Sequence, residues 1–88
     1  MNELMTQLSK SLADEIDGVM NYSEMSKMAK SSGMPKVAAM LHDMAEEEFC
    51  HAKHLKELIH EGHTGTPPAN HAEMVAKYSA AKAAVNEI

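Results

Sequence analysis

Apolar residues, with a few polar ones among them, recur at alternating spacings of four and three along two long segments. The first stripe consists of Leu8, Leu12, Glu15, Val19, Tyr22, Ser26 and Ala29. The second consists of Val37, Leu41, Met44, Glu48, His51, Leu55 and Leu58. A shorter stripe follows at Met74, Tyr78, Ala81, Val85 and Ile88. Because such spacings keep side chains on one helix face, the pattern predicts three amphipathic helices.

Two breaks separate these segments. Gly33 suits the left-handed position after a helix end, and Pro35 suits the first position of the next helix. The second break runs from Gly62 to Asn70 and is rich in Gly, Thr and Pro, and Asn70 with Glu73 resembles a capping box. We therefore predict one domain over residues 1–88, with helices over about 3–31, 35–61 and 70–87 and a loop over 62–69.

The short connection at residues 31–35 makes the first two helices antiparallel neighbours. Such a hairpin has an apolar stripe that the shorter third helix cannot cover along its whole length. The expected solution is association with a second copy. The sequence thus predicts an all-α protein, a helical hairpin plus a short third helix, which completes a four-helix bundle as a homodimer or higher homo-oligomer.

Composition supports this fold class. The chain has 88 residues, and Ala, Met, Leu, Glu and Lys dominate while aromatic residues make up only 3%. The dominant residues are good helix formers, and the scarcity of β-branched and aromatic residues disfavours strands. The nine methionines are interpreted as flexible fillers of helix packing rather than as soft-metal ligands.

Charge and cysteine content exclude several function classes. A formal charge of −5 without a basic stripe argues against nucleic-acid binding, and no apolar run is long enough to span a membrane. The single cysteine excludes an internal disulfide and a CxxC-type metal knuckle. Because the first residues show neither a basic nor an apolar signal region, we expect a cytoplasmic protein.

Three ionisable residues interrupt the apolar stripes, namely Glu15, Glu48 and His51. Counted from the turn at residue 33, they lie at nearly equal distances, so an antiparallel hairpin places them at one height. Glu48 and His51 are three residues apart and therefore neighbours on one helix face. Buried carboxylates are rare unless they are paired or bind a metal.

Carboxylates and an imidazole together suit iron, with manganese or zinc as further possibilities. One hairpin supplies too few ligands for a two-metal site. Two hairpins related by a two-fold axis supply the known di-iron set, which is a Glu from each of two helices and a Glu-x-x-His from each of the other two. The sequence predicts two iron ions per dimer, bound by Glu15, Glu48 and His51 of both copies.

The chain resembles a known family over about residues 8–60. Glu15, followed seven residues later by Tyr22, and the motif from Glu48 to His51 with Ala52 are similar to the first half of a rubrerythrin-type, ferritin-like domain. The second helix pair and the rubredoxin-like iron centre of rubrerythrin are missing. A bundle built from two hairpins is similar to the encapsulated ferritins, although no capsid-targeting tail is evident after the third helix.

This resemblance implies a site that binds ferrous iron and reacts with oxygen or peroxide, with Glu15, Glu48 and His51 as catalytic metal ligands. Glu48 is expected to bridge the two ions, and Glu15 and His51 to be terminal ligands. Because a rubredoxin-like centre that would supply electrons is missing, ferroxidase-type oxidation of iron is expected rather than a complete peroxidase cycle. An external electron donor and a capsid shell remain open, as does whether iron is stored.

Other residues have weaker signals. Tyr22 could support a ligand carboxylate through a hydrogen bond or simply pack in the core, and Glu47 could guide metal entry or be solvated. The histidines near the second break could form a further metal patch, namely His54, His60, His63 and His71. Cys50 is expected to be an inert, buried or half-buried thiol. The alternative to the metal site is a non-enzymatic interaction module whose buried carboxylates set helix register.

Overall fold

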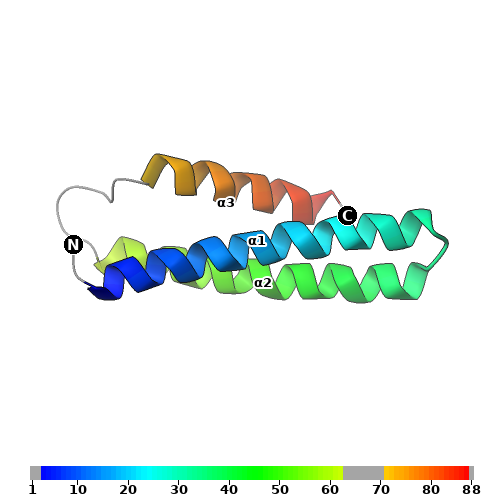
Figure 1. The fold of residues 1–88 in the computed structure, drawn as a ribbon, viewed down its shortest axis with the longest axis horizontal. Helices are drawn as coiled ribbons and strands as arrows, with labels where there is room; N and C mark the ends of the chain where they lie inside the picture. The colour runs from blue at the N-terminus through cyan, green and yellow to red at the C-terminus, as the bar shows by residue number, and fades with distance from the viewer. Residues whose placement is uncertain (1–2, 63–70, 88) are drawn as a thin grey trace.

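The computed structural model describes residues 3–62 and 71–87 and consists of three helices. They are α1 (Glu3–Ser31), α2 (Pro35–Gly62) and α3 (His71–Asn86), and the described residues contain no strand. The all-α class and the three-helix order are therefore confirmed. In Figure 1, α1 and α2 form a long antiparallel hairpin, and α3 runs alongside it in the direction of α1. The loop was predicted over residues 62–69, but Gly62 is the last residue of α2, and residues 63–69 lie outside the described residues.

The turn between α1 and α2 is closed by backbone hydrogen bonds. The Gly33 amide donates to the Lys30 carbonyl at 3.2 Å, and the Met34 amide donates to the Ala29 carbonyl at 2.9 Å. This pair of bonds is the Schellman motif, which requires a left-handed residue after the helix end. Gly33 fills that position with φ of +73°, as the sequence predicts. Pro35 then begins α2, so the two helices reverse direction within three residues.

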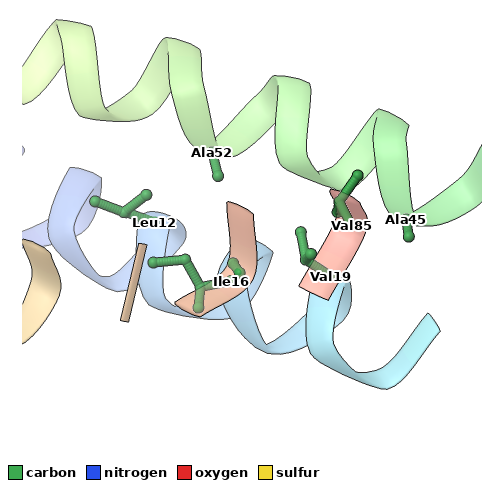
Figure 2. Packing of buried hydrophobic residues seen from close by; sticks show 7 residues of the cluster. Leu12, Ile16, Val19, Ala45, Ala52 and Val85 are labelled. Atoms are coloured by element: carbon green, nitrogen blue, oxygen red, sulfur yellow. The ribbon is translucent and has the colours of Figure 1, made fainter. Parts of the chain in front are cut away.

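The core of the hairpin is made of large residues on α1 and small ones on α2. The buried hydrophobic residues of the central cluster are Leu12, Ile16 and Val19 of α1, Ala45 and Ala52 of α2, and Ala81 and Val85 of α3. Figure 2 shows how the alanines of α2 face the larger side chains of α1. Alanines that recur every seven residues let the two helix backbones approach closely. Near the turn, Ser26 Oγ donates to the Ala38 carbonyl at 2.8 Å and ties the helices together.

The stripe predicted on the second helix is only partly buried. The residues of α2 that pack against α1 most deeply are Ala38, Ala45 and Ala52, which the stripe did not include. Beside them, Leu41, Glu48 and Leu55 are half-buried. The remaining members are exposed in the single chain, namely Val37, Met44, His51 and Leu58. We call these four residues the open face of α2.

Helix α3 covers the side of the hairpin that lies opposite the open face of α2. Two residues of α2 contact Tyr78 of α3. The Phe49 and Tyr78 rings pack with centroids 5.1 Å apart, and Lys56 Nζ lies 4.7 Å from the centre of the Tyr78 ring. On α1, Lys27 forms an ion pair with Glu87, just after α3, at 3.6 Å. Phe49 lies four residues after Ala45, and Glu48 lies three residues after it. Because each residue turns the helix by about 100°, these two side chains lie on opposite sides of Ala45. Phe49 therefore faces α3, whereas Glu48 lies toward the open face.

None of the described helices combines the length and apolar character that a membrane crossing requires.

Candidate metal centre

Glu15, Glu48 and His51 come together beside the open face. A ligand atom from each of them lies within 4.8 Å of the others. His51 Nδ1 is 3.3 Å from Glu15 Oε2, which joins α1 to α2 across the hairpin. The counting of residues from the turn therefore places these side chains correctly at one height.

The three side chains are less buried than their places in the apolar stripes predict. The Glu15 side chain is 26% exposed and the His51 side chain 58% exposed. Glu48 is half-buried. His51 is one residue before the buried Ala52. Because one residue turns the helix by about 100°, His51 points away from the contact between α1 and α2. The three groups therefore open toward the solvent on the side that α3 leaves uncovered.

The carboxylates of Glu15 and Glu48 interact directly. A side-chain hydrogen bond with Glu15 raises the pKa of Glu48 above its ordinary value of 4.5, and burial and the Glu15 charge act in the same direction. The nearby His51 opposes this shift. A cation bound between the two carboxylates would neutralise both charges.

The raised pKa of Glu48 predicts how stability depends on pH without metal. A carboxyl group whose pKa is raised in the folded state stabilises the fold below its unfolded pKa and loses that contribution as pH rises through the folded value. We expect metal-free parent protein to lose stability relative to Glu48→Gln as pH rises above 4.5. The glutamine amide keeps a hydrogen-bond donor toward Glu15 without titrating. Urea unfolding of both proteins across this pH range measures the difference, and parallel curves would contradict the raised pKa of Glu48.

The donor set fits an iron ion. Carboxylate oxygens are hard anionic ligands, and imidazole nitrogen binds the same first-row metals. Glu48 Oε2 lies so close to α1 that a Cβ placed on Gly18 would be 2.9 Å from it, so the carboxylate is held against the backbone of α1 near Glu15. Possible metal ligands from two helices thus converge on one point, as binding of a cation would require.

A comparison with known families agrees with this donor set. The rubrerythrin family model matches residues 7–87. The chain belongs to the rubrerythrin family. Domains of this kind are ferritin-like and bind iron, which confirms the resemblance inferred from Glu15 and the motif between Glu48 and His51. No curated protein and no solved structure gives a significant match to the chain.

Further candidate residues of this rubrerythrin-family chain lie around the site. Tyr22 is half-buried and packs against the core cluster, and within the described residues it makes no hydrogen bond to Glu15 or Glu48. A role for Tyr22 in supporting a ligand carboxylate stays a prediction. Glu47 is exposed beside Glu48, and its negative charge also raises the pKa of Glu48. A role for Glu47 in metal entry stays a prediction.

Cys50 was expected to be buried or half-buried, and this is wrong. It is an exposed free thiol, because it is five residues after the buried Ala45 and therefore points away from α1. His54 and His60 of the predicted histidine patch are exposed on α2. The structure does not test that patch, because His63 and the side chain of His71 lie outside the described residues.

A second group of possible ligands was not predicted from the sequence. Atoms of His42, Asp43 and Glu46 lie within 4.8 Å of one another, and His42 Nε2 is 3.8 Å from Glu46 Oε1. The spacing of four residues between His42 and Glu46 was the signal that could have found it. All three residues belong to α2, and Asp43 and Glu46 are exposed. The site at Glu15, Glu48 and His51 differs in drawing its ligands from two helices.

Proposed function

We propose that the protein is a ferroxidase-type di-iron protein whose site is completed at a homodimer interface. Two hairpins would meet through their open faces around a two-fold axis. Glu15, Glu48 and His51 of each copy would then supply four carboxylates and two imidazoles to two iron ions. The observation that carries this proposal is the convergence of these three side chains from α1 and α2.

The distribution of exposed apolar residues supports the dimer. The open face exposes 40% of Val37, 40% of Met44 and 54% of Leu58, at intervals of seven or fourteen residues along α2. A helix stripe of this kind is the surface by which bundle helices pack. His51 belongs to the same stripe, so a second hairpin that covered the apolar residues would also face the metal ligands.

The proposed reaction uses ferrous iron as its substrate. Each of two ferrous ions gives one electron, and dioxygen takes up both electrons with two protons to form hydrogen peroxide. Glu48 is the expected bridging ligand because its carboxylate lies within 4.8 Å of a ligand atom of both Glu15 and His51, and bridging would couple the two oxidations. The anionic carboxylates stabilise the ferric product more than the ferrous substrate because the ferric ion carries the greater charge.

Iron titration of the metal-free protein tests the half-site. Because each chain supplies half of the ligands for two ions, ferrous iron added without oxygen should saturate near one ion per chain. Isothermal titration calorimetry with elemental analysis measures this ratio, and manganese and zinc titrations show how selective the site is. Saturation at two tight sites on a monomer would contradict the shared site.

A charge on the open face should weaken the dimer. Val37 and Val75 have nearly equal exposure, 40% and 41%, but only Val37 lies on the open face, whereas Val75 belongs to α3. We expect Val37→Lys to raise the dimer dissociation constant at least tenfold, because the lysine charge would lose its hydration in the interface. Val75→Lys should leave the dissociation constant unchanged. Sedimentation of both variants over a dilution series measures the effect, and equal association would place the interface elsewhere.

A further inference from the structure

Gly18 lies in the interior of α1, where glycine is an unfavourable choice. The helix runs from Glu3 to Ser31, and Gly18 is half-buried on it and needs no left-handed backbone. Glycine in a helix interior is less stable than alanine because it loses more backbone freedom on folding. The backbone conformation therefore does not explain a glycine at this position. The property that can explain it is the absence of a side chain.

The space above Gly18 is filled by the side chain of Glu48. A Cβ on Gly18 would lie 2.9 Å from Oε2, 3.4 Å from Cδ and 3.5 Å from Cγ of Glu48. Three successive atoms of the glutamate thus run across the glycine. Gly18 also comes one helical turn after Glu15, on the same side of α1. The glycine thus lets the Glu48 carboxylate lie directly on α1 beside the Glu15 carboxylate.

We propose that Gly18 is a positioning residue for the metal site, which it serves by leaving room for the Glu48 carboxylate against α1. This inference rests on the proposed metal-binding function of Glu15, Glu48 and His51. A methyl group at residue 18 pushes the end of Glu48 outward, because a flexible side chain gives way before the helix backbone does. The two carboxylates then no longer converge on one cation.

The variant Gly18→Ala separates this role from a structural one. Its metal-free form should melt a few degrees higher than the parent, because alanine favours the helix. Its affinity for Co²⁺ and for anaerobic Fe²⁺ should fall at least tenfold, and the visible spectrum of bound Co²⁺ should change as the ligand geometry changes. A residue with a purely structural role would move stability and metal affinity in the same direction.

Gly62→Ala is the matched control. A Cβ on Gly62 would lie 2.9 Å from Met5 Sδ, so it also meets the end of a flexible side chain at the same distance. Gly62 is the last residue of α2 and Met5 belongs to α1, far along the chain from Glu15 and Glu48. We expect this variant to keep the parent's Co²⁺ affinity and spectrum.

The outcomes distinguish this inference from the function on which it rests. Parent protein that binds no stoichiometric Co²⁺ or Fe²⁺ overturns the proposed function and the role of Gly18 together. Parent protein that binds these ions while Gly18→Ala binds them equally well, with an unchanged Co²⁺ spectrum, overturns the role of Gly18 alone. An equal loss of affinity in Gly62→Ala would also overturn it, because the effect would then be general to glycine replacement.

Discussion

Replacing Glu48 with alanine is expected to abolish both metal binding and oxygen-dependent iron oxidation. In a symmetric site one substitution removes both bridging carboxylates at once. Glu48 also lies within reach of both Glu15 and His51, so its loss removes one of the three converging groups. Groups that merely orient ligands contribute about 10–100-fold to metal affinity, so removal of a bridging ligand should cost more than about 100-fold. Elemental analysis, iron titration and the rate of ferrous iron oxidation measure the loss.

Glu47→Gln is the control for this experiment. It removes the same negative charge one residue earlier, where the side chain is exposed and lies outside the group of three ligands. We expect Glu47→Gln to keep tight metal binding and iron oxidation near the parent values. An active, iron-loaded Glu48→Ala protein would end the di-iron assignment.

The sequence predicts the helices of this protein well because their ends have strong local signals. Gly33 and Pro35 mark the turn, and the structure ends α1 at Ser31 and begins α2 at Pro35. The height of Glu15 relative to Glu48 and His51 also follows from the sequence. A short turn fixes the register of an antiparallel hairpin, so counting residues from Gly33 suffices.

The orientation of α2 about its own axis was predicted less well. The stripe of spacing four and three spans a broad arc of the helix, and periodicity alone does not show which edge of that arc meets α1. The small residues decide this, because Ala38, Ala45 and Ala52 allow the closest approach of the helices. The predicted position of Cys50 failed for a related reason, since its exposure depends on where Ala45 and Ala52 point.

The contact between Gly18 and Glu48 could not be predicted from the sequence either. It depends on the rotation of both helices and on the path of a flexible glutamate side chain. The sequence places Gly18 one turn after Glu15, but it gives no distance across the hairpin. The same holds for the hydrogen bond between Glu15 and Glu48, which raises the Glu48 pKa.

Replacing Glu48 with leucine is expected to leave the metal-free protein at least as stable as the parent. The substitution removes a half-buried carboxyl group that lies beside a second carboxylate, and it continues the apolar row of Leu41 and Leu55. Replacing fully buried ionic groups with apolar residues of similar volume is often neutral or stabilising by about 1–4 kcal/mol. Because Glu48 is only half-buried, we expect a gain of up to about 1 kcal/mol in the free energy of unfolding. Urea unfolding in a metal chelator measures this gain.

The same variant distinguishes the metal site from an interaction module whose carboxylates set helix register. If Glu48 serves metal binding, Glu48→Leu keeps the oligomeric state of the metal-free parent and loses iron. If Glu48 sets register, leucine at this position allows other alignments of the helices, so sedimentation should show several oligomers, and iron should hardly change the stability of the parent. The two functions thus predict opposite results for one substitution. Sedimentation and metal content of Glu48→Leu, measured together with the metal dependence of parent stability, decide between them.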